Sequence, residues 1–379
     1  MKSKSTFYLA KAASQFVSVA PLWYRIGGTF LTWEIKGSRL GKKWPIKEWS
    51  IRHFPKMRNN SKFFRQIKQL FPGCEYDTIR HFYLGPYPDD VKILICMTMF
   101  PIPPQDKRDF VTFQFYHGVV DKRFKVGVRR EYPPMFDQWD YWMLPGEKDR
   151  QKLLFHCKNA GITLNEDRLV KIGYLRFDKI INKNYDKREL MNLAGVPDNG
   201  RKNILFAPTW RWGGGTLMSH YKEFCNKIPK THNLIIRNHT NDSRRIREVM
   251  QYCEDNSIEN VYFVSDEIMN ITDNMVFADL MISDNSSVAY DFLILGRPLI
   301  FNKTESPDVI TPEYRFNVRR CGYEYDIESE DILDVIEKSF SSDKFKSHIE
   351  EVKHNCFYFL DGKSTDRAVE FITSARKPI

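Results

Sequence analysis

Two histidines and an arginine stand where apolar runs of the chain end, and their side chains could do acid–base chemistry on an anionic substrate. His117 directly follows an apolar run that ends at Tyr116, and Arg237 and His239 close another run. An imidazole has a pKa suited to a general base near neutral pH, and a guanidinium offers phosphate a bidentate fork. One histidine is not a motif, so a structural His117 that hydrogen-bonds a loop stays open on these residues alone.

A hydroxyl-rich turn predicts a phosphate site. The apolar run 280–282 is typical of a buried strand, and Ser-Asp-Asn-Ser-Ser follows it at 283–287. Apolar residues at helical spacing come next, with Asp291 among them. In open α/β sheets, phosphate-bearing ligands bind at such a strand end, on a helix N-terminus. We therefore expect Ser286 and Ser287 to contact phosphate, although the same residues could simply cap the helix.

A glycine-rich loop follows the apolar run 203–207. It holds Thr209 and Arg211 and continues into the glycines 213–215, whose backbone could approach a ligand closely. The loop is neither a Walker A motif nor a GxGxxG fingerprint, so no dinucleotide is implied. Lys122, in a basic run after His117, could meet an anion or lie on a solvated turn. There is no HExxH motif and no close His/Cys set in the sequence, so we predict no metal site.

Strands that alternate with helices must position these residues, and this alternation predicts parallel sheets. The predicted strands are 91–97, 109–116, 139–144 and 169–174, then 203–207, 233–237, 261–264, 280–282 and 299–301. The predicted helices include 148–160, 188–193 and 271–277, and the chain from 331 onward is expected to be helical. We expect two α/β domains facing across a cleft. An N-terminal basic and aromatic segment (1–90) would begin the first domain (91–195), and the second would span 196–379.

Composition and charge limit the function further. The 379 residues carry a formal net charge of +10, which favours anionic partners, but no block of like charges supports nucleic-acid binding. The seven cysteines lie far apart without a CxxC pair, which predicts reduced thiols in a cytosolic protein. The stretch 12–23 is too short to span a membrane. It could lie on an anionic membrane surface, but we favour a helix that packs on its own domain.

Five short motifs occur in order along the chain. They are Tyr116-His117-Gly118 with Lys122, Gly173-Tyr174-Leu175-Arg176-Phe177-Asp178, Ala207-Pro208-Thr209-Trp210-Arg211, Arg237-Asn238-His239, and Asp279 through Ser287 with Asp291. A weaker sixth is Asp361-Gly362-Lys363-Ser364. Together they resemble the CDP-glycerol glycerophosphotransferase family, which includes teichoic-acid primases and polymerases, over roughly residues 110 to 367.

This resemblance implies a GT-B fold with two Rossmann-like domains and a reaction that needs neither metal nor cofactor. An acceptor hydroxyl would attack the β-phosphorus of a CDP-alcohol, and CMP would leave. His117 would be the base, and His239 with Arg237 would steady the charge on the transferring phosphoryl group. The donor-binding set that the resemblance implies is Arg211, Thr209, Arg237, Ser286, Ser287, Asp291, Lys122 and Arg176.

Some positions depart from the family pattern and leave the donor open. Asn285 stands where the family usually has Tyr, and Leu175 and Thr240 stand where it has Pro. The donor alcohol could be glycerol, ribitol or another polyol. The acceptor would be a glycan or polyol phosphate, including a lipid-linked one, and the protein would act in the cytoplasm or on the inner face of the cytoplasmic membrane. Two alternatives are a GT-B glycosyltransferase that uses a nucleotide sugar and an inactive module that binds an anionic glycan or membrane.

Overall fold

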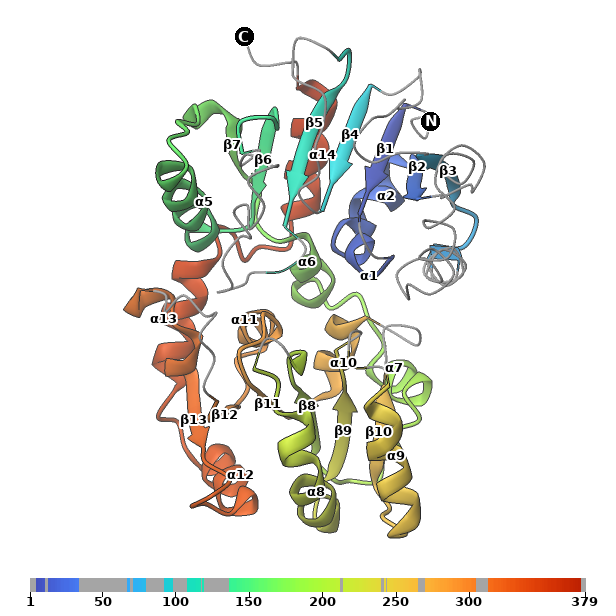
Figure 1. Ribbon diagram of the computed structural model, residues 1–379, viewed down its shortest axis with the longest axis vertical. Helices are drawn as coiled ribbons and strands as arrows, with labels where there is room; N and C mark the ends of the chain where they lie inside the picture. The colour runs from blue at the N-terminus through green and yellow to red at the C-terminus, as the bar shows by residue number, and fades with distance from the viewer. Residues whose placement is uncertain are drawn as a thin grey trace, which may run out of the picture.

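Two parallel β-sheets, one above the other in Figure 1, form the frame of the protein. The computed structural model describes residues 5–10, 13–33, 67–68, 71–79, 92–97, 108–116, 118, 136–211, 214–239, 242, 244–264, 270–304 and 313–375. Every strand pair in both sheets is parallel. The structure therefore confirms the predicted α/β class with two Rossmann-like halves.

The first sheet has seven strands in the order β3-β2-β1-β4-β5-β6-β7. Their bounds are β1 Thr6–Leu9, β2 Thr29–Trp33, β3 Glu75–Ile79, β4 Ile93–Cys96, β5 Val111–Phe115, β6 Tyr141–Leu144 and β7 Leu169–Lys171. The chain adds β2 and β3 on one side of β1 and then adds β4 to β7 on the other side. The order in which strands are added therefore reverses between β1 and β4. The carboxyl ends of strands beside such a reversal border a crevice.

The second sheet has six strands in the order β10-β9-β8-β11-β12-β13. Their bounds are β8 Asn203–Ala207, β9 Asn233–Arg237, β10 Val261–Val264, β11 Leu280–Ser283, β12 Leu299–Asn302 and β13 Gly322–Tyr325. Here the order reverses between β8 and β11. The two central strands are buried along their whole length, as strands covered by helices on both faces should be.

Helices cover the faces of both sheets. In the first half of the chain they are α1 Ala13–Phe16, α2 Ala20–Ile26, α5 Glu147–Asn159, α6 Leu175–Ile181 and α7 Lys187–Leu193, and the 3₁₀ helix η1 spans Val17–Val19. In the second half they are α8 Leu217–Lys227, α9 Ile246–Asp255, α10 Ile271–Phe277, α11 Val288–Phe292, α12 Ile332–Ser341, α13 Lys346–Cys356 and α14 Ser364–Ser374. The predicted helices at 148–160, 188–193 and 271–277, and the helical C-terminal part, are confirmed.

The N-terminal 90 residues contribute more than the partly helical segment that we expected. They supply β1, β2 and β3, and β1 lies in the middle of the first sheet. The sequence analysis missed β1 because a four-residue strand buried on both faces shows no alternation. The segment after β1 packs on its own domain, since Phe16, Val19, Leu22 and Trp23 are buried in the core of the first sheet. β13 was also missed.

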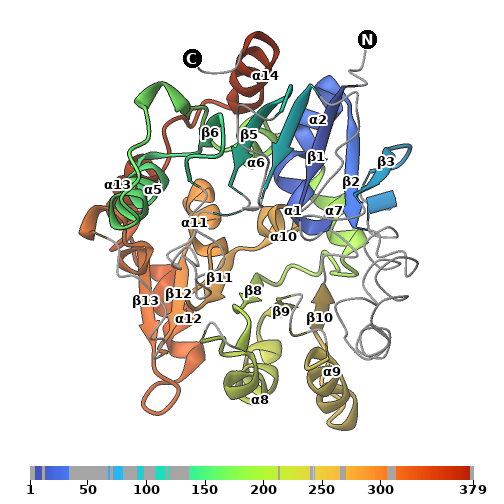
Figure 2. The same ribbon diagram turned by 45° about the horizontal axis from the view of Figure 1, so that its top comes forward.

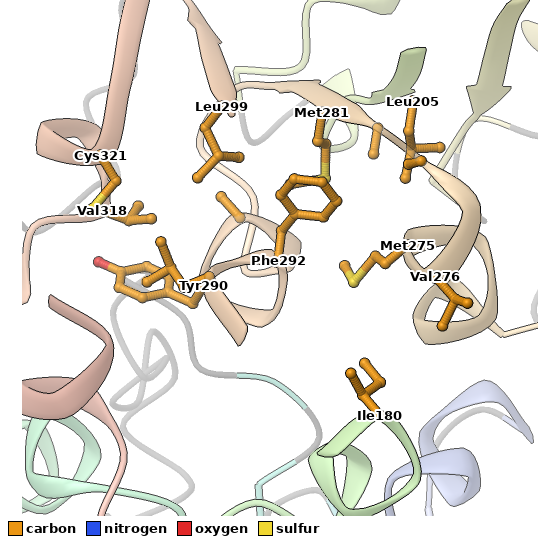
Figure 3. Close-up of a cluster of buried hydrophobic side chains, with 14 of the residues drawn as sticks. Ile180, Leu205, Met275, Val276, Met281, Tyr290, Phe292, Leu299, Val318 and Cys321 are labelled. Carbon is orange, nitrogen blue, oxygen red and sulfur yellow. The ribbon is translucent and has the colours of Figure 1, made fainter. Parts of the chain in front are cut away.

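Helix α6 lies between the two sheets and packs against both cores (Figure 1). Leu175 belongs to the hydrophobic core of the first sheet. Phe177 and Ile180 belong to the core of the second sheet, and Figure 3 shows Ile180 pointing toward that cluster. The short helix therefore joins the two halves, and its Arg176 side chain lies at their junction.

The last helix returns to the first sheet. In Figures 1 and 2, α14 lies beside the strands of the upper sheet, far from the second sheet. Ala368 and Ile372 are buried in the core of the first sheet. The chain thus crosses between the halves a second time after α13, and the range 196–379 contains a helix that packs on the other half.

The cysteines agree with the expectation of free thiols. Six cysteines are buried, Cys74 is half-buried, and all seven are free thiols. Among the described residues, none of the helices has both the length and the apolar character needed to cross a membrane.

Candidate active site

A cleft with a cavity volume of about 170 Å³ opens between the two halves, beside the reversal point of the second sheet. The residues after β8 and β9, the start of α10 and the turn before α11 form one side. Gln15, Val17 and Arg176 form the other side. The cleft brings together Arg176, Arg237, His239, Ser286 and Ser287, which are five of the ten residues that the sequence analysis selected.

Arg237 is the last residue of β9 and borders the cleft although only 5% of its surface is exposed. Its Nη1 donates a hydrogen bond of 2.6 Å to Oδ1 of Asn274, which is fully buried in α10. The Asn270 side chain caps α10 by accepting from the Asp273 N–H. A guanidinium at this position can present its planar fork to phosphate oxygens in the cleft.

His239 lies two residues beyond β9 and also borders the cleft. Its ring centroid is 6.3 Å from that of Trp210, in the loop after β8. The end of β9 thus places the His239 imidazole close to Arg237, and the loop after β8 places Trp210 beside that imidazole. This pair can donate hydrogen bonds to phosphate oxygens.

The hydroxyl-rich turn borders the cleft through half-buried Ser286 and Ser287. Ser287 is the N-cap residue of α11, but its side chain makes no capping hydrogen bond. The alternative that these hydroxyls cap the helix is therefore not what the structure shows for Ser287. Helix α11 ends at Phe292, and the 3₁₀ turn that follows it to Leu295 is closed by Gly296, whose left-handed φ is 62°.

The Asp284 carboxylate of the same turn is buried and has a structural partner set. It accepts hydrogen bonds from the N–H of Thr209 (2.7 Å) and from the N–H and hydroxyl of Thr216 (3.0 and 3.2 Å). Gly215 is required in this loop because a Cβ there would lie 2.0 Å from the Thr209 carbonyl oxygen. Asp284 therefore ties the glycine-rich loop to the hydroxyl-rich turn.

Three of the predicted donor-binding residues do not line the cleft. Thr209 is buried beside Asp284, and Arg211 is exposed, with its N–H donating 3.0 Å to Asp242. Asp291 is 2% exposed and accepts a hydrogen bond of 3.4 Å from Nη1 of Arg176. Burial raises the pKa of the Asp291 carboxyl to about 6, while the charge of Arg176 opposes that rise.

His117 and Lys122 lie outside the described residues. Their neighbour Tyr116 follows β5 at the carboxyl edge of the first sheet. Tyr116 lines a small cavity together with Ser18 and Gly173, close to the start of α6. The end of β5 therefore reaches the junction of the two halves, where Arg176 also lies.

Two of the sequence motifs meet at a structural joint. Asp178 accepts hydrogen bonds from the backbone N–H groups of Ser364 (3.0 Å) and Thr365 (2.6 Å), which begin α14. Gly173 has a φ of 86°, and a Cβ there would lie 2.5 Å from the Ser364 hydroxyl. These motifs therefore dock the last helix on the first half. Their partners are almost 190 residues apart, so no local pattern could have revealed the contact.

The comparisons with known proteins decide the family. The model of the CDP-glycerol:poly(glycerophosphate) glycerophosphotransferase family matches residues 56–374. The chain belongs to this family. It is 24% identical to the teichoic acid poly(glycerol phosphate) polymerase of Bacillus spizizenii, over 98% of this chain and 99% of that one. It is 28% identical to the ribitol-phosphate polymerase TarK of Staphylococcus aureus, over 57% of this chain and 42% of that one.

Solved structures agree on the fold. The wall teichoic acid polymerase TagF matches 98% of this chain and 89% of its own with a TM-score of 0.60 at 15% identity. A UDP-GlcNAc 2-epimerase from Neisseria meningitidis matches 98% of this chain and 99% of its own with a TM-score of 0.54 at 12% identity. The chain thus has a GT-B-like arrangement of two Rossmann-like domains, as the resemblance implied, and its family is one of enzymes.

Proposed function

We propose that the cleft binds the diphosphate of a CDP-alcohol and that the enzyme transfers the alcohol phosphate to a hydroxyl of a glycan, lipid-linked or polymer acceptor. Membership of the glycerophosphotransferase family supports transfer from a CDP-alcohol in teichoic-acid synthesis. The observation that carries the assignment of the site is the meeting of two arginines, a histidine and two serines in one cleft. This set is rich in donors for phosphate oxygens, as an activated diphosphate requires.

In the proposed reaction, the acceptor oxygen forms a bond to the β-phosphorus, and the bond from that phosphorus to the bridging oxygen breaks. CMP leaves with the bridging oxygen and its electron pair. His117 takes the proton of the acceptor hydroxyl, which is the usual role of an imidazole near neutral pH. Arg237 and His239 stabilise the negative charge that develops on the transferring phosphoryl oxygens.

The turn before α11 has a separate role in this proposal. Ser286 and Ser287 donate hydrogen bonds to the diphosphate, and Arg176 reaches the same anion from the other domain. Lys122 lies outside the described residues, and we propose it as a further donor-binding cation. Thr209 and Arg211 do not line the cleft. We therefore assign them to the structure of the glycine-rich loop and not to direct contact with the diphosphate.

A donor panel tests the proposal. The protein is incubated with CDP-glycerol, CDP-ribitol, UDP-glucose and GDP-mannose in the presence of a poly(glycerol phosphate) acceptor, and the released nucleotide is identified by chromatography. We expect CMP from at least one CDP-alcohol and no nucleotide from the sugars. Release of UDP or GDP would instead favour the nucleotide-sugar transferase.

The lipid-linked acceptor and a peripheral position on the inner face of the cytoplasmic membrane belong to the same proposal. The net charge of +10 favours an anionic surface. Co-sedimentation with phosphatidylglycerol vesicles, compared with phosphatidylcholine vesicles, tests this part. Binding to the anionic vesicles alone, weakened by salt, is the expected result, and no binding to either would refute it.

A further inference from the structure

We propose that Asp291 and Ser18 are positioning residues that together hold the Arg176 guanidinium in the cleft, one from each half of the protein. The inference rests on the proposed function, because it assigns the purpose of that hold to the diphosphate of the donor. It also changes the role of Asp291 from a donor ligand, as the sequence suggested, to a residue that acts through Arg176.

The geometry places Arg176 between two partners that are distant in the sequence. Its Nη2 donates a hydrogen bond of 2.7 Å to the Ser18 hydroxyl, and its Nη1 donates one of 3.4 Å to Oδ2 of Asp291. Ser18 lies in η1, which packs with the first sheet, and Asp291 lies in α11, which packs with the second. The rigid, planar fork of a guanidinium can donate hydrogen bonds to two partners in fixed, different directions. A lysine ammonium on its flexible stem does not fix these directions.

Neither of these two partners borders the space in which the donor would bind. Asp291 and Ser18 are 2% and 3% exposed, and neither lines the cleft, whereas Arg176 does. A buried carboxylate is costly unless it is paired and hydrogen-bonded, and Arg176 is its charged partner here. Asp291 can therefore influence the donor only through the side chain that it holds.

The backbone of Arg176 is fixed by the same two halves. Helix α6 buries Leu175 in the core of the first sheet and Ile180 in that of the second (Figure 3). The position between these contacts points to the junction of the halves. Both hydrogen bonds of Arg176 exist together only when the halves have the arrangement seen here, so the orientation of its guanidinium depends on that arrangement.

The test compares Asp291→Asn, Ser18→Ala and Arg176→Ala with the pairwise double variants. The matched control is Lys179→Met, which removes another ion pair of α6 with the second domain (Lys179 Nζ to Asp273 Oδ1, 2.7 Å), between residues that do not line the cleft. Calorimetry gives the affinity for CDP-glycerol, and CMP release gives kcat and KM. Circular dichroism and thermal melts show that each variant folds.

We expect Asp291→Asn and Ser18→Ala each to weaken CDP-glycerol binding and lower kcat/KM by roughly tenfold, since misplacing one binding group by about 1 Å has effects of this order or larger. In the Arg176→Ala background, either change should have no further effect. Lys179→Met should stay within about twofold of the wild type. This non-additivity is the signature of positioning, because a general structural defect would persist without Arg176.

Wild-type affinity after Asp291→Asn and Ser18→Ala, or an undiminished effect of both in the Arg176→Ala background, would overturn the inference. The proposed function is tested separately by the wild type. If it binds CDP-glycerol but releases no CMP, the proposed function fails, and the affinities still decide the role of Asp291 and Ser18. If it binds neither CDP-glycerol nor CDP, the inference fails as well, because no donor anion would reach Arg176.

Discussion

Replacing Asp291 by Asn should make the enzyme's stability less dependent on pH, by an amount that follows from the burial of this carboxyl. Burial raises the pKa of Asp291 from an ordinary 3.8 to about 6 in the folded protein. The Arg176 charge opposes this shift, and the charge of Asp149 on α5 reinforces it. Asp149 and its neighbour Lys148 are both buried on α5, and the Lys148 ammonium lies 4.0 Å from the ring centroid of Tyr290, on α11.

The sign follows from proton binding. The folded protein holds the Asp291 proton more tightly than the unfolded chain does, so this stabilisation is fully present below pH 3.8 and is lost as the pH rises through about 6. At about 1.4 kcal/mol per pH unit, the gap between the two pKa values corresponds to a loss of about 3 kcal/mol for the wild type. Asn does not titrate and shows no such loss.

The assay is urea unfolding of the wild type and Asp291→Asn in steps from pH 4 to pH 7.5. The free energy of unfolding of the variant minus that of the wild type should rise by about 2 to 3 kcal/mol over this range. A constant offset from the lost hydrogen bond to Arg176 cancels in the comparison. A difference that stays flat within about 0.5 kcal/mol, or that falls with pH, would refute the claim that Asp291 is a buried carboxyl with a raised pKa.

Three further changes test other parts of the site. Arg237→Ala should lower kcat by roughly 10²- to 10³-fold, because it removes one group that stabilises transition-state charge. Asn274→Asp is a second probe of the hydrogen bond that holds Arg237. Unchanged CMP release by Arg237→Ala would contradict this role. His117→Ala should abolish turnover while CDP-glycerol still binds in calorimetry, and an equal loss of both would argue against a general base. Asp178→Ala should lower the free energy of unfolding by about 1 to 3 kcal/mol, because it removes the acceptor of two buried N–H groups at the start of α14, and a melting temperature equal to that of the wild type would contradict it.

The second domain was largely predictable from the sequence. Its central strands are apolar runs closed by polar residues, and the runs 203–207, 233–237 and 261–264 are strands with those bounds. The helix 271–277 is also found as predicted. Local signals are strong here because the central strands β8, β9 and β11 are buried on both faces and polar residues follow them.

The first domain was predicted less completely. Strand β1 has four residues, and its aromatic side chains beside lysines resemble an amphipathic surface segment. Its identity as a central strand comes from pairing with β2 and β4, which are far away in the sequence. Such pairing leaves no periodic trace in a run this short.

For the site, strand ends were a sound guide, and side-chain partners were not predictable. Arg237, His239, Ser286 and Ser287 were selected because they follow strands, and the sheet order brings them to one edge. The roles of Asp284 and Asp291 depend on partners more than 60 residues away, Thr216 and Arg176 respectively. From sequence alone, a carboxylate that binds a donor and one that holds a loop look the same.

The most direct test of the central claim follows the β-phosphate itself. CDP-glycerol labelled with ³²P at the β-phosphorus is incubated with the enzyme and a poly(glycerol phosphate) acceptor, and the products are separated by size. The proposed transfer puts the label into the polymer and leaves unlabelled CMP. Label that stays with a released cytidine nucleotide, with none in the polymer, would contradict it.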